Sequence, residues 1–100
     1  MLLYNVTCHV THTIHEAWFS WLMDSHIPAM MDTGSFTGYK MFRLLDQDEQ
    51  EGLTYVIQYS LTDLQTFRTF ETSYPELALG PVKDGFFPQC MAFQTIMSEV

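Results

Sequence analysis

The chain begins with a run, residues 2–11, in which apolar and polar residues alternate. A period of two predicts a β-strand whose side chains point to opposite faces of a sheet. The apolar face carries Tyr4, Val6, Cys8 and Val10. The polar face carries Asn5, Thr7, His9 and Thr11. One face of this strand therefore suits a core, and the other must meet water, a ligand or a partner.

The next segment changes to the period of an α-helix, predicted over residues 14–24. The residues at i, i+3, i+4, i+7 and i+8 are Ile14, Ala17, Trp18, Trp21 and Leu22. Thr13 and Glu16 have the spacing of a capping box. Because a proline disfavours the α region for its predecessor, we expect a bend at Ile27. Pro28 would then open a short second helix that Gly34 ends.

The second half of the pattern predicts a hairpin, another helix and a last strand. Residues 36–45 and 53–61 are rich in aromatic and β-branched residues and flank the acidic stretch DQDEQEG, which we interpret as a solvated loop. Thr62 and Gln65 offer a second capping box, and the helix that follows is interrupted by prolines. Residues 89–97 are predicted to form the last strand.

The predicted order of elements, β-α-β-β-α-β, is that of the ferredoxin-like split unit. We therefore predict an α+β fold in one domain over residues 1–100. It would have a four-stranded antiparallel sheet with two helices on one face. Because the helices cover one face only, the other face stays open.

The open face is predicted to be semi-polar. Its polar residues would be Asn5, Thr7, His9, Gln58 and Gln94, among apolar neighbours. Such a face is too apolar for bare solvent and too polar for a core. We predict a homodimer through this face, with a semi-polar cavity between the two sheets and a possible small apolar ligand inside it.

Charge limits the partners that the chain can have. The formal net charge is −8, and the four basic residues do not cluster. Nucleic acids and anionic membrane surfaces need basic patches, so we expect neither as a partner. The first ten residues lack the basic start of a signal peptide, and no apolar run approaches the roughly 18 residues of a membrane span. Two cysteines make no disulfide framework, so we expect a cytoplasmic protein.

Several stretches resemble an uncharacterised bacterial family, the domain of unknown function 4286. They are LLYNVT at the start, the pair Trp18 and Trp21, the HIP…DTGSF segment from His26 to Phe36, residues 54–59, and MAFQT near the end. The likeness covers nearly the whole chain. It implies a dimeric α+β barrel, in which two ferredoxin-like sheets pack face to face. It implies no reaction, so no catalytic residue is carried over.

Two interpretations of His26 stay open. At a helix end, its ring could bond the last carbonyls and interact favourably with the helix dipole. Alternatively, the ring faces the mouth of the cavity near Trp21 and Tyr39, where it could move a proton near neutral pH. Asn5 and His9 likewise either form a polar pair in the dimer seam or orient a ligand.

We predict neither a metal site nor a cofactor. His9, His12 and His15 lie on a strand and around a helix start, so their rings should not converge on one ion. Residues 62–87 contain no histidine that could hold a haem iron, and the chain has no glycine-rich phosphate loop. Cys8 and Cys90 are expected to be small buried apolar residues.

The pattern favours a homodimeric small-ligand-binding or interaction domain. The predicted ligand-binding residues are Asn5, His9, Trp21, His26, Tyr39 and Gln58. The alternative is a small cofactor-free enzyme, similar to a monooxygenase or isomerase, that acts on an apolar or aromatic compound. Its catalytic candidates are His26, His9 and Tyr39. The sequence leaves open whether the protein is an enzyme.

Overall fold

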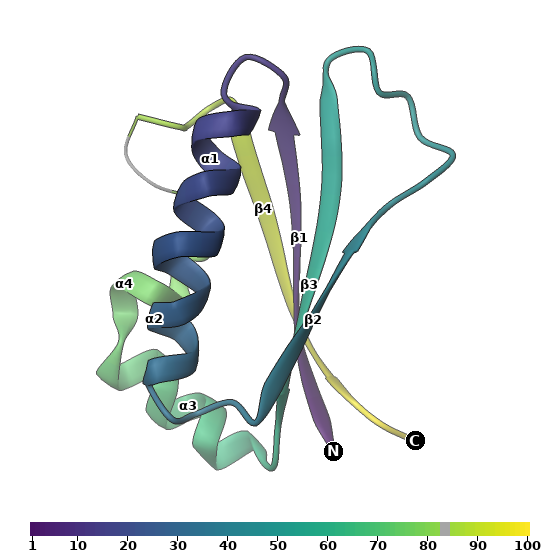
Figure 1. Cartoon of the computed structure of the whole chain (residues 1–100). Helices are drawn as coiled ribbons and strands as arrows, with labels where there is room; N and C mark the ends of the chain where they lie inside the picture. The colour runs from purple at the N-terminus through teal and green to yellow at the C-terminus, as the bar shows by residue number, and fades with distance from the viewer. Residues whose placement is uncertain (83–84) are drawn as a thin grey trace.

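The computed structural model of the chain describes residues 1–82 and 85–100 (Figure 1). The first half contains a strand, a helix in three parts and an edge strand: β1 Leu2–Thr11, α1 His15–Trp21, the π-helical turn η1 Leu22–His26, α2 Ile27–Asp32 and β2 Gly38–Arg43. The second half contains β3 Gly52–Leu61, α3 Leu64–Ser73, α4 Pro75–Ala78 and β4 Cys90–Ser98.

The four strands form one antiparallel sheet in the order β2-β3-β1-β4. The helices of the described residues lie on one side of this sheet, and no other described segment covers the opposite side (Figure 1). This arrangement confirms the predicted α+β, ferredoxin-like fold class. The predicted strands over residues 2–11, 53–61 and 89–97 recur within one residue at each end, whereas the strand predicted over residues 36–45 is shortened to Gly38–Arg43.

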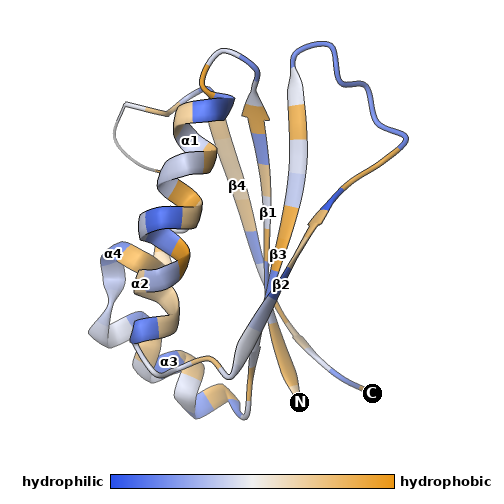
Figure 2. Ribbon diagram, viewed as in Figure 1, coloured by the Kyte–Doolittle hydropathy of each residue, from blue (hydrophilic) through white to orange (hydrophobic). Residues whose placement is uncertain are grey.

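The core lies between the sheet and the helices because β1 and β3 turn every second side chain toward them. Along β1 the hydrophilic and hydrophobic colours alternate (Figure 2). The Trp18 indole is fully buried, and its Nε1–H donates to the carbonyl of Pro81 at 2.9 Å. The largest fully buried side chains are Trp18, Tyr59, Phe70, Leu22 and Met30.

The predicted bend at Ile27 is wrong. Ile27 keeps helical angles, φ −63° and ψ −45°, and the chain runs helically from α1 through η1 into α2. A proline inside a helix lacks an N–H and crowds the carbonyl four residues earlier. The wider π turn that ends at His26 relieves this crowding just before Pro28. Gly34, with φ 75°, follows the helix end as predicted.

Neither predicted capping box forms. The Thr13 hydroxyl bonds to the Thr11 hydroxyl at 2.8 Å, and α1 begins without a side-chain cap. At α3, the Asp63 carboxylate accepts from the Thr66 backbone N–H at 2.7 Å and from the Thr66 hydroxyl at 2.8 Å. These two hydrogen bonds lower the pKa of Asp63. A short carboxylate at the N-cap position reaches the free N–H groups directly, so the cap lies one residue after the predicted Thr62.

Candidate functional site

A polar row crosses the uncovered face of the sheet. The strand register aligns four residues, one from each strand: Thr95, Asn5, Gln58 and Lys40. All four side chains point away from the helices because their neighbours along each strand face the core. The centre of the open face therefore presents amide, hydroxyl and ammonium groups in one line.

Apolar side chains flank this polar row on the edge strands. The adjacent row has a phenylalanine at each end, Phe93 on β4 and Phe42 on β2. Phe93 is 65% exposed and Phe42 is 47% exposed. Met91 and Met97 on β4 are also exposed on this face. The open face is thus mainly polar along its central strands, and its large exposed apolar side chains lie on the edge strands.

The ring of His9 is oriented by its cross-strand neighbour. His9 Nδ1 lies 3.0 Å from the Thr54 hydroxyl, and the two residues are partners in the register of β1 and β3. Among the described residues, His9 Nε2 has no hydrogen-bond partner. On the same face, Asn5 donates weakly to the Thr7 hydroxyl, at 3.5 Å. The sheet therefore presents one imidazole nitrogen and one amide to whatever covers it.

The structure divides the six predicted ligand-binding residues between the two faces of the sheet. Asn5, His9 and Gln58 lie on the open face, as predicted. Trp21, His26 and Tyr39 lie on the side of the helices.

Gln94 was also expected on the open face, but it aligns with the core residue Val6. Its amide nitrogen donates to the Ala78 carbonyl at 3.0 Å. The register of β4 against β1 decides this placement, and a lone edge strand does not reveal its own register.

His26 lies in the core and not at the mouth of a cavity on the open face. The residue is 5% exposed, and its ring lies 5.0 Å from that of Trp21. Burial lowers the pKa of His26 to about 4, so the ring is neutral at pH 7. Tyr39 packs elsewhere, against Tyr59 on the neighbouring strand. His26 also lies within a continuous helical segment, so it does not cap a helix end.

The other histidines bind separate partners. His12 Nε2 lies 2.7 Å from the Glu49 carbonyl, and His15 Nε2 lies 2.6 Å from the Tyr55 hydroxyl. Within residues 1–82 and 85–100, no three His, Cys, Asp or Glu side chains are grouped in a way that could hold a metal ion.

The two cysteines, Cys8 and Cys90, are buried and free. Burial raises the pKa of both thiols, that of Cys90 to about 11. Both side chains are therefore neutral thiols inside the core. Neither cysteine has the reactivity of a thiolate.

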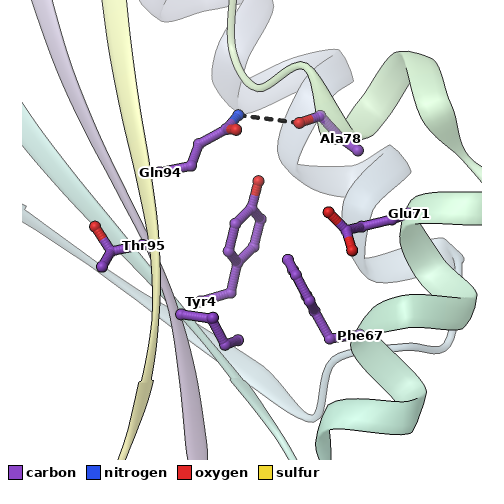
Figure 3. A pocket seen from close by; sticks show the side chains of 7 residues that line it. Tyr4, Phe67, Glu71, Ala78, Gln94 and Thr95 are labelled. Atoms are coloured by element: carbon purple, nitrogen blue, oxygen red, sulfur yellow. Dashed lines mark hydrogen bonds between the residues drawn. The ribbon is translucent and has the colours of Figure 1, made fainter.

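A cavity that the sequence did not reveal lies on the side of the helices, between β4 and the pair α3 and α4 (Figure 3). Its volume is about 190 Å³. The lining residues are Tyr4, Phe67, Glu71, Ala78, Gln94, Thr95 and Ile96. Two features of the sequence point to this cavity. Glu71 follows Phe67 by four residues, so both lie on the same face of a helix, and Gln94 is the polar residue on a strand face that also carries Ala92 and Ile96.

The sequence matches a known family over its whole length. Residues 1–100 match the family described as a domain of unknown function, DUF4286. The chain belongs to the DUF4286 family. No curated protein matches this DUF4286 chain. In the described part of the chain, every helix is too short or too polar to cross a membrane.

Solved structures resemble the DUF4286 chain in fold. An EthD family protein from Bacillus halodurans superimposes with a TM-score of 0.67 at 11% identity, covering 100% of both chains. A dimeric ferredoxin-like protein from an uncultured marine organism has a TM-score of 0.64 at 12% identity, covering 99% of this chain and 97% of its own. A variant of SnoaB, a cofactor-independent oxygenase from Streptomyces nogalater, has a TM-score of 0.60 at 11% identity, covering 98% and 92%. At these identities the likeness establishes the fold alone.

Proposed function

We propose that this DUF4286 protein is a homodimer that binds a small, largely apolar ligand between its two sheets. The observation that carries the proposal is the distribution of side chains on the open face. Polar side chains predominate on the two central strands, while the large exposed apolar side chains lie on the edge strands. We call the exposed side chains of Phe42, Phe93, Met91 and Met97 the apolar border. Large apolar side chains of this kind are not expected on a sheet face that meets only water.

A second copy of the chain is the occupant that suits this face best. Phe42, Phe93, Met91 and Met97 expose apolar surface together on one side of the molecule, and such patches mark association sites. A two-fold dimer brings the same patch from each copy together, so one apolar border can seal against another. The structural likeness to a protein described as dimeric and ferredoxin-like supports this choice.

The polar row indicates what the enclosed space would bind. Lys40 has no ion-pair partner among the described residues, and Gln58 and Asn5 stand beside it in the same row. These groups can donate hydrogen bonds to a carbonyl or hydroxyl oxygen. The apolar neighbours would contact the rest of the ligand. A small apolar or aromatic compound with one oxygen-bearing group meets both requirements.

Sedimentation tests the dimer. We expect the wild-type protein at micromolar concentration to sediment at twice the chain mass of 11.6 kDa. Phe93→Glu should give the monomer, because two charges would be buried without partners in the seam. Leu79→Glu is the matched control, since Leu79 is 71% exposed but lies after α4 on the other side of the sheet. A monomeric wild-type protein, or a dimeric Phe93→Glu, would contradict the proposal.

A titration with 1-naphthol, an aromatic compound with one hydroxyl, tests the ligand site. We expect saturable NMR shifts of the backbone amides of the open face, such as those around Asn5 and Gln58. Gln58→Leu keeps the side-chain volume but removes its hydrogen bonds, so it should weaken binding about fivefold. Shifts that are absent, or confined to the helices, would count against a cavity between the sheets.

A second candidate function is catalysis by His9. Thr54 orients its ring and leaves Nε2 free, which is an arrangement suited to a general base. Among the structures of similar fold, SnoaB is described as a cofactor-independent oxygenase. If the protein is such an enzyme, oxygen uptake with hydroxylated aromatic compounds should be measurable and should fall at least about 100-fold in His9→Ala. Uptake that is absent, or equal in the variant, would dismiss this candidate.

A further inference from the structure

The cavity between β4 and the pair α3 and α4 is lined by a tyrosine hydroxyl that has no hydrogen-bond partner among the described residues. Tyr4 is 3% exposed, and its hydroxyl points into the cavity (Figure 3). No hydrogen bond joins this hydroxyl to any described residue. A phenolic hydroxyl can both donate and accept a hydrogen bond, so this one is available to a molecule that enters the cavity.

The polar groups around the hydroxyl are mainly acceptors. The Gln94 amide nitrogen already donates to the Ala78 carbonyl, which leaves the amide oxygen for a ligand. The Glu71 carboxylate faces the Tyr4 ring from α3 (Figure 3). Among the residues that the structure describes, no basic side chain lines the cavity. Such surroundings favour a cation that donates hydrogen bonds and disfavour an anion.

The backbone supports this arrangement at Gly80. This glycine has φ 90°, and a Cβ placed there would collide with the Gln94 side-chain amide. The absence of a side chain at Gly80 therefore allows the Gln94 amide to lie across this end of the cavity.

Size and apolar walls limit the ligand to one ring or a short chain. The cavity volume is about 190 Å³, and an engineered cavity of about 150 Å³ is known to accept benzene. The Tyr4 and Phe67 rings, 4.9 Å apart and tilted by 54°, form one wall. Aromatic faces of this kind also attract an ammonium group.

Arg68 would compete with such a cation for the Glu71 carboxylate. Its guanidinium lies 2.8 Å from Glu71 Oε1 on the exposed side of α3, and it also lies over the Phe67 ring. The second oxygen of Glu71 has no partner among the described residues. Removing the arginine would therefore leave the whole carboxylate charge to a ligand.

We propose that this cavity is a binding site for a compact single-ring primary amine, separate from the seam between the sheets. Its ammonium group donates to Glu71, to the Gln94 amide oxygen and to the Tyr4 hydroxyl. Its ring packs against Phe67 and Ile96. The site is independent of the proposed dimer, because it lies on the opposite side of the sheet.

The test compares benzylamine, benzyl alcohol and benzoate by NMR titration of the full-length protein at pH 7.5. Benzylamine should shift amides around Glu71, Ala78 and Gln94 and bind about tenfold more tightly than benzyl alcohol, a difference typical of one charge-assisted hydrogen bond. Benzoate should not saturate. Absence of saturable benzylamine shifts, or benzoate binding as tight, would overturn the proposal.

Four variants assign any binding to this cavity. Glu71→Gln should weaken benzylamine about tenfold and leave benzyl alcohol unchanged, whereas Arg68→Gln should strengthen benzylamine. Tyr4→Phe should weaken both compounds by about fivefold. Glu16→Gln, at an exposed position of α1 outside the cavity, is the charge-matched control and should change neither affinity. Equal benzylamine affinities in wild type, Glu71→Gln and Arg68→Gln would show that the amine binds elsewhere.

Discussion

His26 is a titratable residue that the fold places inside an apolar core. Its neighbours are aromatic, with the Trp21 ring at 5.0 Å and Phe86 packed in turn against Trp21. Burial makes the charged form of the ring unfavourable and lowers its pKa from 6.5 to about 4. The unfolded chain therefore binds this proton more readily than the folded chain does.

This difference makes stability depend on pH. The contribution of His26 is fully present above pH 6.5 and is lost as the pH falls toward 4. Between pH 7 and pH 5 the loss should be about 2 kcal/mol. Urea unfolding at the two pH values measures it. His26→Asn lowers stability but should remove this part of the pH dependence. An unchanged difference between the two pH values in the variant would contradict the assignment.

Two tyrosines on β3 allow a matched comparison of hydroxyl groups. The Tyr59 hydroxyl is buried and has no hydrogen-bond partner among the described residues, whereas the Tyr55 hydroxyl bonds to His15. Tyr59→Phe should therefore stabilise the protein by about 1 kcal/mol, and Tyr55→Phe should destabilise it by a similar amount. Chemical denaturation of both variants tests this. Destabilisation by Tyr59→Phe would show that its hydroxyl has a partner.

At the scale of elements, the segment from α1 to α2 is one helical cover for the sheet. Its π turn, Leu22–His26, lets Pro28 remain inside the helix instead of ending it. The helix consequently buries both Leu22 and Met30 against the sheet. A helix broken at Ile27 would have turned one of these residues away from the core.

The start of β3 depends on a close approach of two strands at Gly52. A Cβ at Gly52 would collide with the Val10 carbonyl on β1, whereas a Cβ at Gly38 would meet nothing within 4 Å. Gly52→Ala should therefore cost about 2–3 kcal/mol, since the backbone must shift. Gly38→Ala should be neutral or slightly stabilising. Thermal unfolding of the two variants checks the contrast, and equal Tm values would contradict it.

At the scale of the whole molecule, a chain of 100 residues buries only a modest fraction of its surface when it folds alone. Its uncovered sheet face still exposes Phe42, Phe93, Met91 and Met97. In the proposed dimer this surface would be buried, and association would contribute to the stability of each copy.

The proposed dimer makes the melting temperature depend on concentration. Raising the protein concentration a hundredfold, from about 1 to 100 µM, should raise Tm by about 5 °C or more. In Phe93→Glu the dependence should disappear, and Leu79→Glu should keep it. Differential scanning fluorimetry over this range provides the measurement. A Tm that is constant in the wild type would mean that folding is not coupled to association.

Much of the architecture follows from local pattern. The alternation along residues 2–11 and 53–61 fixes which side chains of β1 and β3 meet the helices, and the structure keeps both assignments. Asn5, His9 and Gln58 were placed correctly for this reason. Period and element order are properties of neighbouring residues, so they can be predicted from the chain itself.

The remaining features required the tertiary structure, because they depend on register and on distant neighbours. Gln94 faces the helices only because β4 aligns it with Val6, and His26 is neutral only because core side chains surround it. The cavity at Tyr4 joins residues from β1, α3 and β4 that are far apart in sequence. The sequence by itself determined the elements and the faces of its central strands. Only packing decided which polar groups share a site, since burial and proximity are properties of the folded chain.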